Sequence, residues 1–263
     1  MTSATETPVV RLRGGVAMPL LGFGTWQATG TRGYEAVRDA LQVGYRHLDT
    51  ATFYRNEDEV GRAVRDSGVP REDVFVTTKM PPGRAGRERQ TLAESLRELA
   101  MDYLDLWLVH WPPRDRARPE TWQQLLGLRD EGLTRAVGVS NYSIRQIDEL
   151  IDATGEAPAV NQIPWSPFSY EAGLVAAHRE RGVVVEGYSP FKGSDLDHPV
   201  LTSIAAAHGV TAAQVVLRWH LQHEIVVIPK SVTRERIAEN FDVLGFELTA
   251  EEMASIDGLG GRR

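Results

Sequence analysis

The sequence predicts an α/β fold, a (β/α)8 TIM barrel with an N-terminal β-hairpin and two extra C-terminal helices. Three observations support this prediction: β-rich runs alternate with helical patterns, eight such runs occur in 263 residues, and several runs are continuously apolar. Continuous apolar runs are typical of parallel strands covered on both faces, and eight βα units typically take about 250 residues. Because no linker or low-complexity tract interrupts the pattern, residues 1–263 are predicted to form a single domain.

The elements follow in chain order. A hairpin is predicted over residues 9–19, where Gly14 and Gly15 separate two short apolar runs. The eight strands are predicted at residues 20–25, 46–50, 74–79, 104–110, 135–140, 159–163, 183–188 and 225–229. Helices are predicted between them at 33–43, 58–67, 87–100, 119–130, 144–153, 172–181 and 212–222, and after the last strand at 233–240 and 249–256. A doubly wound sheet is the alternative, but the cluster from Gly22 to Gly24 lacks the third glycine of the dinucleotide fingerprint.

Composition excludes several classes of partner and site. The formal charge of −7 argues against nucleic acid, whose backbone requires an excess of clustered Lys and Arg. No basic leader or long apolar run is present, so we expect a cytoplasmic protein with no membrane partner. The absence of cysteine excludes disulfides and thiolate ligands. His220 and His223 have a spacing that metals can use, but no third ligand accompanies them, so no metal site is expected.

Candidate catalytic residues lie where predicted strands end, which is the face where barrel enzymes work. Asp49 ends the second strand and Tyr54 follows it, Lys79 ends the third, and His110 ends the fourth. A nearby ammonium stabilises a phenolate, so Lys79 is expected to lower the pKa of Tyr54. Asp49 would keep the lysine protonated, and His110 would bind a substrate oxygen. Each residue alone has an ordinary structural interpretation, and only their joint occurrence favours a catalytic site.

Three motifs then resemble signatures of the aldo-keto reductase family. They are GYRHLDTA at residues 44–51, RAVGVSNY at 135–142 and IPKS at 228–231, the last continuing through Arg236, Glu239 and Asn240. The resemblance covers essentially the whole chain and is closest to the bacterial, short-loop members that are like 2,5-diketogluconate reductase. It implies a barrel that binds NADPH without a Rossmann domain and reduces aldehydes or ketones.

The resemblance also implies residue roles. Asp49, Tyr54, Lys79 and His110 become the catalytic tetrad, with Tyr54 the general acid. Ser140, Asn141 and Gln162 would hold the nicotinamide carboxamide, Tyr188 would stack on its ring, and Lys192 would lie near the pyrophosphate. Lys230, Ser231 and Arg236 would hold the adenosine 2′-phosphate, which predicts NADPH over NADH, and Glu239 and Asn240 would contact the adenine. The complete cofactor set is Gly24, Thr25, Ser140, Asn141, Gln162, Tyr188, Ser189, Pro190, Phe191, Lys192, Lys230, Ser231, Val232, Arg236, Glu239 and Asn240.

The substrate pocket is expected to contain Trp26, Phe53 and Trp111, although tryptophan is more often a core residue. The loop at 111–119 and the segment after Asp257 are shorter than in many members, which predicts an open site of low discrimination. Small aldehydes, α-dicarbonyls and keto sugars are the expected substrates, and a monomer is expected. Two alternatives stay open: an NADPH-binding, redox-sensing regulatory subunit with little turnover, and a barrel isomerase that does not use nicotinamide.

Overall fold

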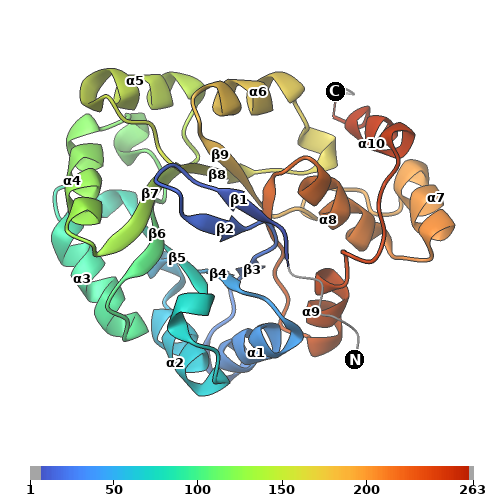
Figure 1. Cartoon of the computed structure of the whole chain (residues 1–263), viewed down its shortest axis with the longest axis horizontal. Helices are drawn as coiled ribbons and strands as arrows, with labels where there is room; N and C mark the ends of the chain where they lie inside the picture. The colour runs from blue at the N-terminus through green and yellow to red at the C-terminus, as the bar shows by residue number, and fades with distance from the viewer. Residues whose placement is uncertain (1–6, 261–263) are drawn as a thin grey trace.

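The fold is a closed barrel of eight parallel strands. The computed structural model describes residues 7–260 and places β3 to β10 in one parallel sheet in chain order (Figure 1). A bridge between Leu21 and Val227 joins the first strand to the last and closes the sheet. The strands are β3 (Phe23–Gly24), β4 (His47–Asp49), β5 (Phe75–Met80), β6 (Leu104–Val109), β7 (Thr134–Ser140), β8 (Val160–Pro164), β9 (Val184–Tyr188) and β10 (Val226–Ile228).

Helices surround this barrel on the outside (Figure 1). They are α1 (Gly30–Val43), α2 (Glu57–Ser67), α3 (Glu88–Leu99), α4 (Pro119–Asp130), α5 (Ile144–Thr154), α6 (Ala172–Glu180), α8 (Ala212–Gln222) and α9 (Arg234–Phe241). The short 3-10 helices are η1 (Thr52–Tyr54), η2 (Arg71–Asp73), η3 (Pro82–Arg84), η4 (Pro113–Asp115) and η5 (Pro167–Ser169). The predicted (β/α)8 barrel is confirmed, and α4 and α8 have the predicted bounds.

The C-terminal part contains one helix that the sequence pattern did not predict. This helix, α7 (Pro199–His208), lies between β9 and α8 and packs against α10 (Ala250–Asp257). Of the two helices predicted after the last strand, α9 packs between α8 and α1 and α10 lies outside the ring. Capping boxes begin several helices, among them α8, where Thr211 and Gln214 bond reciprocally. Among the described residues no single helix meets the length and apolarity of a membrane span; α7 and α8 together, across a 90° bend, meet those two criteria.

The predicted hairpin is confirmed. Strands β1 (Val9–Arg11) and β2 (Ala17–Pro19) pair antiparallel, and the turn uses Gly14 and Gly15 at φ 85° and 83°. Such positive φ values favour glycine because it has no Cβ. Met18 of this hairpin is fully buried in the core, so the hairpin covers the end of the barrel where the strands begin (Figure 1).

The barrel interior is filled by side chains from successive strands. Every residue of β5 and β6 is buried, including the polar Thr77, Thr78 and Lys79 of β5 and Asp105 of β6, as expected of strands covered on both faces. Gly22 leaves no room for a side chain: a Cβ there would lie 2.4 Å from His47 Nδ1 and 2.8 Å from Ile228 Cγ2. The absence of a side chain there makes room for a histidine inside the barrel, one layer beneath the end of β4.

Candidate active site

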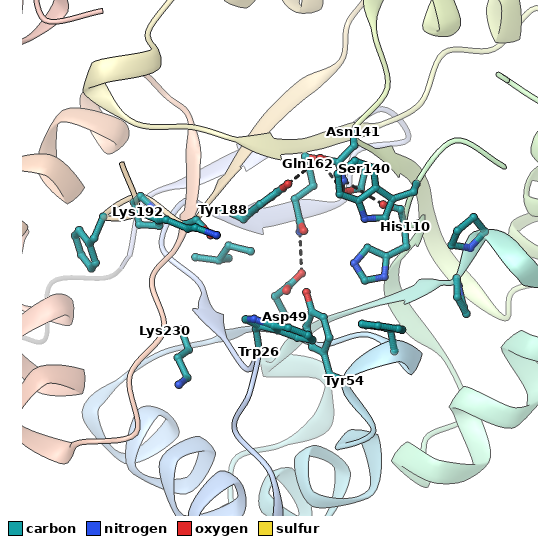
Figure 2. A pocket seen from close by; sticks show the side chains of 18 residues that line it. Trp26, Asp49, Tyr54, His110, Ser140, Asn141, Gln162, Tyr188, Lys192 and Lys230 are labelled. Carbon is teal, nitrogen blue, oxygen red and sulfur yellow. Dashed lines mark hydrogen bonds between the residues drawn. The ribbon is translucent and has the colours of Figure 1, made fainter. Parts of the chain in front are cut away.

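The four predicted catalytic residues converge at the carboxyl ends of neighbouring strands. Asp49 ends β4, Lys79 lies in β5, His110 follows β6, and Tyr54 ends η1. Figure 2 shows Asp49, Tyr54 and His110 facing one cavity. Because adjacent parallel strands end on the same face, residues far apart in sequence meet there.

Lys79 is the buried centre of this group. Its side chain is 0% exposed, and its Nζ donates to Asp49 Oδ1 at 2.6 Å, to the Thr50 carbonyl at 2.8 Å and to Tyr54 Oη at 3.4 Å. These contacts use all three donors of an ammonium group. Burial opposes the charged form, but Asp49 and Tyr54 outweigh it and raise the pKa of Lys79 above its ordinary value. The lysine is therefore a fixed positive charge beside the tyrosine hydroxyl.

Tyr54 differs from the sequence expectation in the net direction of its pKa. Burial raises the pKa of Tyr54, and the Lys79 charge, which lowers it as predicted, is the smaller effect. The expected net decrease is therefore wrong for the protein alone, because desolvation of the phenolate outweighs its attraction to the ammonium. The hydroxyl stays protonated at neutral pH and is available to donate.

His110 stands beside Tyr54 and is uncharged. The centres of the two rings are 5.7 Å apart at an interplanar angle of 74°. Burial, together with the Lys79 charge, lowers the pKa of His110 to about 3. A neutral imidazole can donate or accept one hydrogen bond at each nitrogen, which suits the binding of a polar substrate atom.

The predicted nicotinamide-binding side chains form a linked polar group on the opposite wall (Figure 2). Gln162 Nε2 donates to Asp49 Oδ2 at 2.8 Å, and Tyr188 Oη donates to Asn141 Oδ1 at 2.8 Å. Ser140 Oγ donates to the Gln162 carbonyl at 2.8 Å and accepts from Asn141 Nδ2 at 2.9 Å. The network fixes these amides and hydroxyls before any cofactor arrives, and it connects them directly to Asp49.

The cavity between these walls has a volume of about 590 Å³. Trp26, Phe53 and Trp111 stand at its edge with 45%, 63% and 50% of their surface exposed, so these aromatic side chains are pocket residues and not core. The Trp26 and Phe53 rings are stacked, with centres 6.0 Å apart. The other predicted residues that line the cavity are Asp49, Tyr54, His110, Ser140, Asn141, Gln162, Tyr188, Ser189, Pro190, Phe191, Lys192 and Lys230.

The remaining predicted residues lie outside the cavity lining. Thr25 packs behind Asp49, donating from Oγ1 to its carbonyl at 3.0 Å, and Gly24 precedes it at the end of β3. Ser231 bonds to the backbone of Thr233, and Glu239 Oε1 accepts from Thr211 Oγ1. Val232 is half-buried, Asn240 is buried and Arg236 is exposed on α9. The predicted adenosine-binding residues therefore lie in the segment before α9 and along α9, which follows Lys230 in the chain.

Sequence reasoning missed an arginine beside Lys230. Burial and the nearby charge of Arg32, on the first turn of α1, lower the pKa of Lys230. Within residues 7–260, Arg32, Lys230 and Arg236 form no ion pair. Cations that repel one another without a carboxylate partner suit an anionic ligand. No motif marks Arg32, because it comes close to Lys230 only through the closure of the barrel.

Asn56 and Glu186 were also missed. Asn56 is buried and bonds to Thr50 Oγ1 and to the carbonyls of Thr25 and Ala28, which fixes the loop that carries Trp26. Glu186 is buried inside the barrel below Tyr188. The signal for Glu186 was present in the sequence, since it is a single acid in the apolar strand 183–188.

His220 and His223 contact different partners. His220 Nδ1 lies 2.7 Å from the Val216 carbonyl, and His223 Nε2 lies 2.8 Å from Asp257 Oδ1. No group of three or more His, Asp or Glu side chains arranged to hold a metal ion occurs in the described part of the chain.

Comparison with known proteins agrees with this geometry. The profile of the Aldo/keto reductase family matches residues 20–260. The chain belongs to this family. Morphine 6-dehydrogenase of Pseudomonas putida is 44% identical over 273 residues, covering 97% of this chain and 92% of that protein. Methylglyoxal reductase DkgA of Escherichia coli K12 is 43% identical over 253 residues, covering 94% and 92%.

A solved relative shows the same architecture. The aldo-keto reductase of Bombyx mori, determined in complex with NADP, is 34% identical and superimposes with a TM-score of 0.90 over 98% of this chain and 94% of that one. Family membership confirms the prediction of an NADP-dependent oxidoreductase that acts on carbonyl groups. Membership in this family does not favour the alternative of a barrel isomerase that works without nicotinamide.

Proposed function

We propose that this aldo-keto reductase transfers a hydride from NADPH to the carbonyl carbon of small aldehydes, α-dicarbonyls and keto sugars, with Tyr54 as the general acid. One observation supports the assignment most strongly: Lys79 Nζ contacts both Asp49 and Tyr54, and Tyr54 and His110 line the same cavity. The proposed acid, Tyr54, and the neutral hydrogen-bonding group, His110, thus face the same cavity, and the charge of Lys79 lies directly behind Tyr54.

The residues present fit the cofactor. Tyr188 offers a half-buried ring beside Asn141 and Ser189, whose left-handed backbones at φ 63° and 56° turn the chain around the cavity. Ser140, Asn141 and Gln162 would hold the carboxamide, and Pro190, Phe191 and Lys192 would lie along the pyrophosphate. Lys230, Ser231 and Arg236, with Val232 next in the chain, would hold the 2′-phosphate, and Glu239 and Asn240 would contact the adenine. Gly24 and Thr25, at the end of β3 beside Asp49, complete the proposed cofactor set.

NADPH supplies the hydride when bound, and the chain's own residues handle the proton. His110, uncharged, donates a hydrogen bond to the carbonyl oxygen and orients it toward Tyr54. Tyr54 Oη gives its proton to that oxygen as negative charge develops there. Lys79 stabilises the resulting phenolate, and Asp49 keeps Lys79 protonated and in place.

The substrate range follows from the shape of the pocket. Three exposed aromatic rings stand at the edge of the cavity, and the polar side chains that line it are those assigned above to proton transfer and to the cofactor. The relatives named for methylglyoxal and for morphine indicate that related barrels accept carbonyl or alcohol groups on very different scaffolds. A cytoplasmic monomer, as the sequence predicts, is part of the same proposal and is checked by light scattering and cell fractionation.

The first experiment is NADPH oxidation with a panel of aldehydes, ketones, α-dicarbonyls and keto sugars, with NADH in parallel. Tyr54→Phe should retain NADPH binding, measured by fluorescence quenching, and lose at least about 100-fold in turnover, the contribution of a general acid. Turnover of the variant at the wild-type rate would refute the assigned acid. Tight NADPH binding with no turnover of any compound by the wild-type protein would instead favour the regulatory-subunit alternative.

A further inference from the structure

A second carboxyl lies inside the barrel beneath the catalytic group, and the mechanism does not use it. Glu186 is the third residue of β9 and pairs in register with Gln162 and Val226. It is 0% exposed, and in the described part of the chain neither carboxyl oxygen accepts a hydrogen bond of ordinary geometry; the neighbouring Gln162 side chain only partly offsets its burial. Its side chain faces the interior, because Tyr188, two residues later, lines the active-site cavity.

A second buried titratable group, His47, lies beside Glu186. Glu186 Oε1 lies 3.6 Å from His47 Nε2, and the same nitrogen lies 3.3 Å from Thr77 Oγ1. His47 is also fully buried, and it precedes Asp49 by two residues on β4, so it occupies the layer below the Lys79–Asp49 pair. The remaining charged or titratable groups whose fields act on Glu186, or on which it acts, are Asp49, Lys79 and Tyr54.

A charge without hydrogen bonds is costly in such a place. An isolated carboxylate moved from water to an apolar interior gains a proton unless a partner compensates it. Burial, reinforced by the Asp49 charge, raises the pKa of Glu186 to about 8, and burial lowers the pKa of His47 to about 3. Both directions favour uncharged forms, so at neutral pH the proton lies on Glu186 and His47 is neutral, and the pair is not an ion pair.

We propose that Glu186 is a positioning residue of the active site, which holds a proton near His47 at neutral pH and, on losing it at alkaline pH, places a second negative charge beneath Asp49 and Lys79. The consequence for catalysis rests on the proposed role of Tyr54. Ionised Glu186 raises the pKa of Tyr54 and makes it a weaker acid. We expect the charge of ionised Glu186 to shift the pKa of Tyr54 by about one unit. Such a shift corresponds to roughly a threefold slower proton transfer from Tyr54.

The kinetic test compares rates within each variant. Glu186→Gln keeps the shape of the side chain and mimics its protonated form at every pH. In single-turnover reduction with NADPH deuterated at the transferred position, the wild-type rate should fall about threefold between about pH 6.5 and about pH 9. The Glu186→Gln rate should stay constant over the same interval. An equal fall in both proteins would overturn the proposal.

A matched control separates this effect from general loss of a buried acid. Glu88 is also buried, but its Oε1 accepts from Gly86 N at 2.8 Å and Thr121 Oγ1 at 2.9 Å on the outside of the barrel. Glu88→Gln should keep the wild-type ratio of rates. Loss of the pH effect in Glu88→Gln as well would show that the effect does not belong to Glu186.

A direct titration does not depend on turnover. In wild-type protein labelled with 13C at glutamate Cδ, one carboxyl resonance should titrate near pH 8. In Glu186→Gln that resonance should be missing. Ionisation of every glutamate below about pH 6 would overturn the proposal even if the enzyme reduces carbonyls as proposed. Conversely, a proton on Glu186 without any reductase activity would leave this inference standing and remove only the proposed function.

Discussion

Asp49→Asn is the most informative single substitution in this barrel, because it removes one charge of a buried pair and keeps the shape. Lys79 would lose the negative charge of its 2.6 Å partner yet remain fully buried, with only neutral acceptors around it: the new amide oxygen, the Thr50 carbonyl and the Tyr54 hydroxyl. Leaving one member of a buried ion pair without its partner typically costs about 3–5 kcal/mol. For a chain of this length each kcal/mol lowers Tm by about 2–4 °C, so a decrease of roughly 10 °C is expected.

The pH dependence of the free energy of unfolding of Asp49→Asn provides a second, independent check, because it reports the direction in which the pKa of Lys79 has shifted. In the wild-type protein the pKa of Lys79 is raised, so its stabilisation is present at neutral pH and is lost only above the ordinary lysine range. Without Asp49, burial dominates and lowers the Lys79 pKa. The unfolded state of Asp49→Asn then binds more protons than the folded state, and its free energy of unfolding should rise between about pH 7 and about pH 9.5.

Urea denaturation at several pH values measures both effects. Glu149→Gln is the control, because its partner Arg145 is 89% exposed and the pair contributes less than about 0.5 kcal/mol. A loss below about 1 kcal/mol in Asp49→Asn, or a stability that falls with pH over that interval, would contradict the description of Lys79 as a buried cation held by Asp49.

Three further predictions concern the cofactor site, the neutral histidine and the barrel interior. Lys230→Ala with Arg236→Ala should weaken NADPH binding at least about 10-fold more than NADH binding in fluorescence titrations, and an equal loss for both would remove the 2′-phosphate assignment. Because the pKa of His110 is lowered to about 3, kcat/KM should show no histidine inflection between about pH 5 and about pH 7.5; an inflection that His110→Gln abolishes would disprove a neutral His110. Gly22→Ala should cost about 1–3 kcal/mol in urea denaturation, since its Cβ would meet His47 at 2.4 Å. Gly127→Ala in α4, with nothing within 4 Å, should instead stabilise by about 0.5–1 kcal/mol, and similar effects of the two would contradict the packing argument.

The spacing of apolar residues along the sequence predicted the barrel, because strands and helices bury their side chains with different repeats. Helix α7 was missed since its apolar residues, in a run such as Ile204 to Ala206, show no clear polar face, and His198 is an unusual N-cap. In the site, motif spacing predicted the tetrad, whose members meet because adjacent strands end together. The net pKa of Tyr54 was predicted with the wrong sign, because burial depends on packing that a linear pattern does not contain. Arg32 was invisible for a related reason, as only barrel closure brings it near Lys230.

The hairpin at the start of the chain has a consequence for how the interior exchanges protons with solvent. β1 and β2 lie across the end where the strands begin, and Leu12, Met18 and Leu20 seal that end with buried apolar side chains. The cavity that Tyr188 lines opens at the other end, so we expect water and ions to reach Glu186 and His47 past Tyr188, through the mouth where the cofactor would bind. A bound cofactor would block this passage. The protonation states of Glu186 and His47 would then stay, for that catalytic cycle, as they were when the cofactor bound. The enzyme's response to a sudden change of pH should accordingly be slower with cofactor bound than without it.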